Sequence, residues 1–141
     1  GRVSGNENRD SLELALSYDA DRDGVIDFTG LLTGDAERDE TAAALQAAHL
    51  GSLDFLKVGH HGSRVSLSQE LASRLSPGVA VASAGEGNEY GHPDPTCVSL
   101  LKRAGASFYC TKDVGTVTLL PRERGCLVRT ERGAERGGDV S

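Results

Sequence analysis

The stretch 56–63, LKVGHHGS, decides how this chain is organised. An apolar run over 53–58, which predicts a short buried β-strand, stops there at a glycine-flanked turn that carries His60 and His61. Some twenty residues upstream, another apolar run stops in the same way at Gly34 and Asp35. Metal ligands are usually mounted at such strand ends, on loops that a rigid sheet holds. The two turns therefore indicate a site at the ends of neighbouring strands.

Outward from these turns, the chain alternates between strand and helix patterns, which predicts an α/β fold. Strands are expected over 11–18, 25–32, 53–58 and 79–84, with 107–111 and 114–120 as a closing pair around Lys112 and Asp113. Helices are expected over 37–50, from the capping-box spacing at 66–69 up to Pro77, and from Asp94-Pro95 to Gly105. Residues 1–10 are expected to be a flexible leader, 11–128 the domain, and 129–141 a disordered tail rich in Arg, Glu and Gly.

Composition excludes some classes of protein. The 141 residues suit one domain, and 15 basic against 21 acidic residues give a net charge of −6. That balance argues against a free-standing nucleic-acid binder with a basic face, but not against an enzyme whose metal ions hold a phosphate. No apolar run approaches the roughly twenty residues of a membrane span, so we expect this chain itself to be soluble. The three cysteines lack the CxxC spacing of zinc ribbons and redox motifs.

The metal candidates are Asp35, His61 and His60, and each has a plainer interpretation. Asp35 could ligate a metal or cap the helix that follows, since both roles need the same exposed position. Adjacent residues on an extended segment point opposite ways, so only one of the two imidazoles should enter a given site. A histidine pair between glycines is an unusual core element, which favours a functional role. One carboxylate and one or two imidazoles are only part of a coordination shell, because catalytic zinc takes three protein ligands.

The polar loop 88–93 is a second candidate region, and we expect His92, Asn88 and Ser63 to contribute to catalysis. His92 precedes a proline and should be extended. Asn88 can bridge backbone groups, so a structured turn explains it nearly as well. Ser63 can donate to a phosphate or cap the next turn.

An acidic segment over 19–27 matches the first nine positions of a calcium loop. Its possible ligands are Asp19, Asp21, Asp23 and Asp27, with the required glycine at the sixth position. The twelfth position is Gly30 where a bidentate glutamate is expected, and the flanks read as strands. The alternative is an acidic hairpin turn, because Asp-Gly is a favoured turn dipeptide.

Several loops in this order resemble the metallo-β-lactamase-type domain of the ComEC competence proteins. The segments that carry the resemblance are Asn8 with Ser11-Leu12, 31–35 (LLTGD), 56–63 (LKVGHHGS), 83–93 (SAGEGNEYGHP), and Thr111 with Gly115. The resemblance covers roughly residues 8–120. It implies a metallo-β-lactamase-like fold, an αββα sandwich, of which this chain would form only the carboxy-terminal half, with a mixed sheet flanked by helices.

The same resemblance implies that this chain is part of a metal-dependent phosphodiesterase or nuclease domain, which holds zinc or manganese when complete. Asp35 would bridge two metals and His61 would be the last imidazole ligand, with His60 less favoured. His92 and Asn88 would line the substrate side. The parent protein would lie in the bacterial cell membrane with this domain extracytoplasmic, and would take up single-stranded DNA.

The chain departs from the family pattern in one important way. The first metal motif of the family, a His-x-Asp-x-Asp-His type cluster, belongs to the N-terminal half of the domain, and nothing in this sequence replaces it. We therefore expect the fragment alone to be inactive. A non-catalytic accessory or binding module of the uptake machinery is the alternative function.

The missing half also predicts self-association. Two sheets pack face to face in the implied fold, so the apolar strand faces at 12–16, 53–55 and 79–81 should lack their partner here. A bare face of that size exceeds what soluble monomers tolerate. We expect a homodimer that buries over about 1,200 Å² in total.

Overall fold

The computed structural model describes residues 11–133 and 139–140. The leader expected over 1–10, including Asn8, and the tail positions 134–138 and 141 lie outside the described residues.

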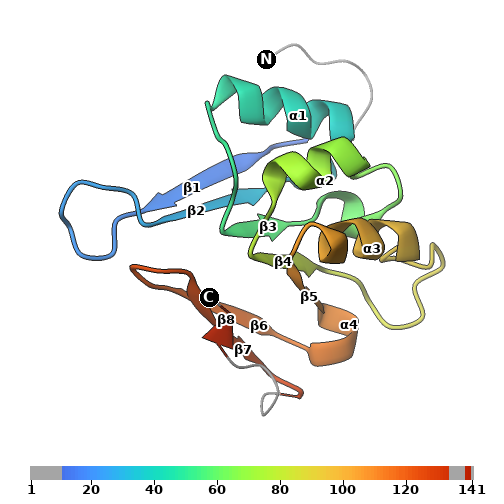
Figure 1. The fold of residues 1–141 in the computed structure, drawn as a ribbon. Helices are drawn as coiled ribbons and strands as arrows, with labels where there is room; N and C mark the ends of the chain where they lie inside the picture. The colour runs from blue at the N-terminus through green and yellow to red at the C-terminus, as the bar shows by residue number, and fades with distance from the viewer. Residues whose placement is uncertain (1–10, 134–138, 141) are drawn as a thin grey trace.

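A five-stranded mixed sheet forms the centre of the fold, in the order β1-β2-β3-β4-β5 (Figure 1). Its strands are β1 Leu14–Tyr18, β2 Phe28–Leu32, β3 Phe55–Lys57, β4 Val79–Ala82 and β5 Ser107–Cys110. β1 pairs antiparallel with β2, and the strands from β2 to β5 are parallel. The α/β class and the mixed sheet expected from the sequence are confirmed. Because four strands run the same way, their carboxyl ends meet at one edge.

Three helices cover one face of this sheet (Figure 1): α1 Arg38–Ala47, α2 Gln69–Leu75 and α3 Pro95–Arg103. Their buried leucines pack with the sheet residues that point the same way, and the resulting core includes Leu45, Leu75, Leu101, Leu56 and Ala80. All four residues of β4 are buried, because both faces of this strand are covered, which explains why β4 reads as a continuous run of small apolar residues.

A second, antiparallel sheet covers the opposite face (Figure 1). It contains β6 Val117–Pro121, β7 Cys126–Thr130 and β8 Asp139–Val140. Cys126 and Val128 of β7 form one apolar cluster with Phe55, Val79 and Val81 of the central sheet. The fold is therefore layered as helices, sheet and sheet. The expectation of a bare face is wrong for Phe55, Val79 and Val81, because the chain covers them with its own carboxy-terminal strands. The apolar residues at 12–16 do stay exposed, as expected.

Strands form at both places where a closing pair was expected, as β5 and β6, but the pairing expected between them is wrong. β5 ends at Cys110, and residues Thr111–Val114 form the short helix α4 instead of a turn between paired strands. Gly115 follows with φ +71°, and the chain then enters β6 in the second sheet. The tail was expected to begin at residue 129, but β7 continues to Thr130.

Helix starts are set by side-chain caps at two places. Asp94 accepts a hydrogen bond from the backbone N–H of Thr96, which confirms the predicted cap of α3. At α2 the cap is Ser68, which accepts from Leu71 N, and not Ser66 as the capping-box spacing predicted. Ser66 is buried and donates instead to the carbonyl of Gly59.

Strand β1 is the exposed edge of the central sheet. All five of its residues are exposed, and Leu14, Leu16 and Tyr18 each leave at least two fifths of their surface in solvent. Leu12, just before the strand, is 82% exposed. Among the residues that the structure describes, no helix is long and apolar enough to cross a membrane.

Candidate metal centre

The predicted site residues gather at the carboxyl edge of the central sheet. Asp35 follows β2, the 3-10 helix η1 (Gly59–Gly62) follows β3, and the loop that carries His92 follows β4. Backbone hydrogen bonds join these loops: His60 N donates to Gly34 O at 2.9 Å, and Asp94 N donates to Gly62 O at 2.8 Å. Parallel pairing of the strands thus brings together segments that are distant in sequence.

The turn at 59–62 is strained. His60 and His61 have φ of 47° and 57°, in the left-handed region that residues with a side chain rarely adopt. The extended conformation expected for this pair is therefore wrong. Such strain persists where the surroundings enforce it, commonly at functional sites. Here Ser66 Oγ donates to Gly59 O at 2.6 Å, and a side chain on Gly59 would meet Ala36 O at 2.5 Å.

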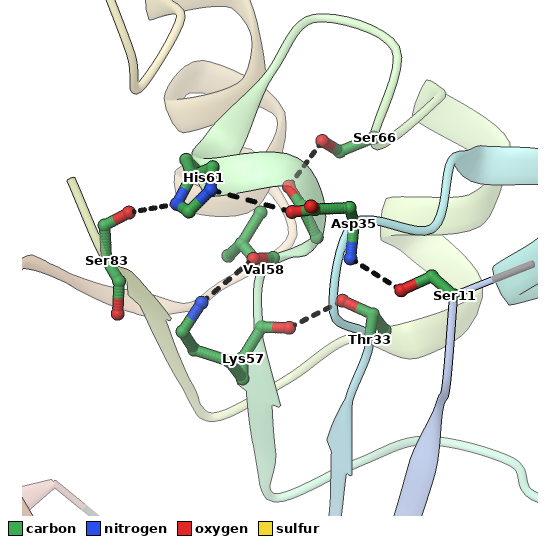
Figure 2. Close-up of polar contacts among 9 residues, drawn as sticks. Ser11, Thr33, Asp35, Lys57, Val58, His61, Ser66 and Ser83 are labelled. Atoms are coloured by element: carbon green, nitrogen blue, oxygen red, sulfur yellow. Dashed lines mark hydrogen bonds and ion pairs between the residues drawn. The ribbon is translucent and has the colours of Figure 1, made fainter. Parts of the chain in front are cut away.

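Asp35 is held beside this turn and does not cap the helix that follows. The N-cap of α1 is Glu37, so the capping alternative is wrong. The backbone N–H of Asp35 donates to Ser11 Oγ at 2.9 Å, and Thr33 Oγ1 donates to Lys57 O at 2.7 Å (Figure 2). These bonds tie the end of β2 to β3 and to the segment before β1, while the Asp35 carboxylate stays half exposed.

His61 points toward Asp35 and toward the end of β4 (Figure 2). Its Nδ1 lies 2.8 Å from the carbonyl oxygen of Ser83, and its Nε2 lies 3.5 Å from Asp35 Oδ1. A carbonyl only accepts, so Nδ1 carries a proton and donates it. In the neutral imidazole the lone pair is then on Nε2, facing the carboxylate. A backbone carbonyl that fixes the tautomer in this way is the usual outer partner of a metal-binding histidine.

His60 points to a different neighbour. Its ring meets that of His92 edge to face, with 5.8 Å between centroids. The Nδ1 atoms of both rings are buried and have no hydrogen-bond partner among the described residues. Burial lowers the pKa of His92, and the imidazoles of His60 and His61 lower it further. The ring of His92 is therefore favoured in the neutral form that can accept a proton or a cation.

Asn88 organises the loop 83–93. Its side-chain nitrogen donates to Gly85 O at 3.0 Å and to His92 O at 2.8 Å, and its oxygen accepts from His92 N at 2.7 Å. These bonds favour the structural interpretation of Asn88, and its catalytic role stays a prediction. Ser63 is buried, its hydroxyl accepts a long bond of 3.4 Å from Val65 N, and its role in catalysis likewise stays a prediction.

Two lysines near the site were missed in the sequence. Lys57 Nζ donates to Val58 O at 3.3 Å, and burial lowers its pKa while the Asp35 carboxylate opposes that shift. Lys112 Nζ lies 3.4 Å from His92 O. Their positions in the sequence could have identified both lysines. Lys57 ends β3 and Lys112 comes just after β5, at the same sheet edge as the other site residues. Lys57 thus places positive charge near Asp35, and Lys112 places it near His92.

The acidic segment 19–27 forms a hairpin turn between β1 and β2. Ligand atoms of Asp19, Asp21 and Asp27 lie within 4.8 Å of one another. Their carboxylates already accept backbone bonds, for example from Gly24 N to Asp19 and from Ala20 N to Asp27, both at 2.8 Å. Asp23 accepts from Val25 N within the same turn. Calcium binding there stays a prediction, and an acidic turn explains the geometry as well.

The residues present fit part of a divalent metal site. Asp35 Oδ1 and His61 Nε2 are both electron-pair donors in the neutral tautomer, and they face each other across 3.5 Å. Two facing acceptors need a proton or a cation between or beside them. Two ligands do not complete a shell of three or four. Only the acidic hairpin brings three potential ligands within mutual reach in the described ranges 11–133 and 139–140.

Comparison with known proteins yields two relatives. The chain is 37% identical over 87 residues to the ComE operon protein 3 of Bacillus subtilis, which covers 62% of this chain and 11% of that protein. It is 42% identical over 73 residues to Recombination protein 2 of Haemophilus influenzae, which covers 52% of this chain and 9% of that protein. The matched regions thus make up about a tenth of each relative. No protein-family model matches the chain.

Proposed function

We propose that this chain supplies part of a metal-dependent phosphodiesterase or nuclease domain within a DNA-uptake protein of the bacterial membrane. The observation that carries the proposal is the pairing of Asp35 with His61. A backbone carbonyl fixes the tautomer of His61, and its free lone pair faces a carboxylate at the edge of a parallel sheet. The names of the two relatives support a role in competence and recombination.

The proposed fold is the carboxy-terminal half of a metallo-β-lactamase-like sandwich. Support comes from the layering of helices, mixed sheet and second sheet, and from the placement of the site at the strand ends. In this proposal the domain is extracytoplasmic, and single-stranded DNA approaches the edge where Lys57 and Lys112 lie.

Each residue has a defined role in the proposal. Asp35 and His61 hold zinc or manganese, and Ser83 orients His61 through its carbonyl. When bound, the metal supplies Lewis acidity, which lowers the pKa of water and neutralises charge on a phosphodiester. The lowered pKa of His92 keeps its ring neutral near pH 7, so His92 is the general base of the proposal. Lys57 and Lys112 attract the phosphate backbone through their charge.

The decisive experiment joins this chain to a segment with a His-x-Asp-x-Asp-His cluster and measures cleavage of labelled single-stranded DNA. Asp35→Asn and His61→Ala should each lower the cleavage rate at least 100-fold. Loss of a residue that only hydrogen-bonds a metal ligand lowers activity by roughly 10- to 100-fold, so a larger effect indicates direct ligation. His49→Asn is the matched control, because it removes an exposed imidazole at a positive φ that asparagine tolerates. Unchanged rates in both site variants would remove these residues from the active site.

A non-catalytic binding module is the second candidate, and one observation favours it. In the part of the chain that the structure describes, no group of three metal-binding side chains gathers at the sheet edge, so too few ligands lie there for a catalytic metal. In that case the joined protein binds DNA but shows no metal-dependent cleavage. The same cleavage assay separates the two functions.

A further inference from the structure

A pocket of about 230 Å³ opens beside the Asp35–His61 pair. It is lined by His61, Ala84, Gly85, Asn88, Tyr90 and His92. Its volume is below the roughly 300–1,000 Å³ of pockets that enclose drug-sized ligands, so it suits a single ring system. The small side chain of Ala84 and the absence of one at Gly85 leave this space open, since a Cβ built on Gly85 has no atom within 4 Å.

Tyr90 forms an aromatic wall of this pocket. Its ring stacks on that of His92, with 5.6 Å between centroids and 17° between planes. Tyr90 is nevertheless 81% exposed. A large aromatic side chain supported on one face and open to solvent on the other is poorly explained by packing within the chain. Asn88 holds His92 at its backbone N–H and carbonyl, so the support beneath Tyr90 is fixed in place.

Positive charge lies next to the same loop. Lys112 Nζ makes a long hydrogen bond of 3.4 Å to His92 O, which holds its ammonium group beside the stacked rings. An aromatic face beside a cation is the combination by which proteins hold single-stranded nucleic acid, with the base on the ring and the phosphate on the charge.

We propose that Tyr90, supported by His92, is a stacking platform for one nucleobase of single-stranded DNA, with Lys112 contacting the adjacent phosphate. This inference rests on the proposed function for the identity of the ligand. The base occupies the space over Gly85. Lys112 contacts the phosphate on one side of this nucleotide, and the phosphodiester on the other side points toward Asp35 and His61. Stacking is tolerant of sequence because every base has a π-face, so the platform positions the strand and does not read it.

The test is binding of fluorescent oligothymidylate and of an abasic strand of equal length to the intact chain. Fluorescence anisotropy is measured in EDTA, so that divalent metal plays no part. The oligothymidylate should bind about tenfold more tightly than the abasic strand. Tyr90→Ala should remove that difference, whereas Tyr90→Trp should preserve it. Gly85→Leu should also remove it, by filling the pocket from a position without backbone strain.

Each other result overturns the inference. Three results would do so: equal affinity for the two strands, no detectable binding of either strand at any concentration tested, or a difference in affinity that survives Tyr90→Ala. Because Tyr90 is exposed, circular dichroism should show that its variants fold as the parent does. The proposed function fails separately: a base-dependent difference in EDTA, together with DNA cleavage that ignores Asp35→Asn, keeps the platform and rejects the metal site.

Discussion

His61 Nε2 lies 3.5 Å from Asp35 Oδ1, while its Nδ1 donates to the carbonyl of Ser83 at 2.8 Å. The three residues come from the ends of three adjacent parallel strands. The imidazole is therefore oriented by one strand end and presented to another. Both side chains are about half exposed, so a simple ion pair between them would contribute little stability in water. The arrangement is better suited to sharing a cation.

The isolated chain should bind zinc or manganese weakly, because two ligands offset little of the cost of dehydrating the ion. Elemental analysis after exhaustive dialysis should find well below one metal ion per chain. A stoichiometric ion that survives dialysis and disappears in Asp35→Asn would contradict this, and would indicate that other groups complete the shell.

Gly62 is expected to be irreplaceable in the histidine turn. It has φ +82°, and an added Cβ would lie 2.6 Å from Pro93 Cβ. Gly62→Ala should lower the free energy of unfolding by about 2 to 4 kcal/mol, from backbone strain and overpacking together. Urea denaturation measures this. Gly85→Ala is the control and should change stability by less than about 0.5 kcal/mol, since its site is open. Equal effects of the two changes would refute the strain argument.

Glu13 should make stability depend on pH. Burial raises its pKa from 4.5 to about 7, Glu40 adds to the rise, and a hydrogen bond with Thr41 opposes it. The folded state therefore binds this proton more tightly than the unfolded state does. The contribution of Glu13 is greatest below pH 4.5, is lost as the pH rises through 7, and is constant above that.

The variant Glu13→Gln cannot lose a proton, so its stability should fall less between pH 4.5 and 7 than that of the parent. Urea midpoints measured across this range for both proteins check the prediction. Parallel profiles would show that Glu13 has the same pKa folded and unfolded.

Self-association is still predicted, but of the three strand faces expected to drive it only the one at 12–16 remains available. The faces at 53–55 and 79–81 are covered, whereas β1 remains an apolar edge strand with Leu14 and Leu16 exposed. Such edges pair readily with another chain. We expect two copies to pair β1 with β1 in antiparallel fashion about a two-fold axis.

Sedimentation at micromolar concentration should detect this dimer, and Leu16→Lys should dissociate it. Val65→Lys is the control, because Val65 is similarly exposed, at 37% against 41%, but lies in a loop. A parent chain that stays monomeric at all concentrations tested would refute this pairing.

Most of the central sheet was predictable because its signals are local. Apolar runs ended by glycine predicted β2, β3 and β4, and Asp94 with Pro95 predicted the start of α3. The second sheet was not predictable in the same way, because no local pattern says which sheet a strand joins. The short apolar run Cys126-Leu127-Val128 was a usable signal for β7, but the charged residues that follow obscured it.

The arrangement of the candidate site residues was predicted in part, and their role as metal ligands stays a prediction. Strand-end position correctly brought Asp35 and His61 together, although the conformation expected for the histidine pair was wrong. The left-handed turn depends on Gly59 and Gly62 fitting against distant segments, and this contact is invisible in the sequence. Lys112 was missed because the segment after β5 was read as a turn between strands.

The most direct test of the account is a Mn²⁺ titration followed by nuclear magnetic resonance of the imidazole and carboxylate signals. Paramagnetic broadening should appear first at His61 and Asp35, spare His49, which is an exposed histidine at the end of α1, and weaken in Asp35→Asn. Broadening confined to the acidic hairpin at 19–27, or equal broadening at His49 and His61, would contradict the claim that Asp35 and His61 form part of a metal site.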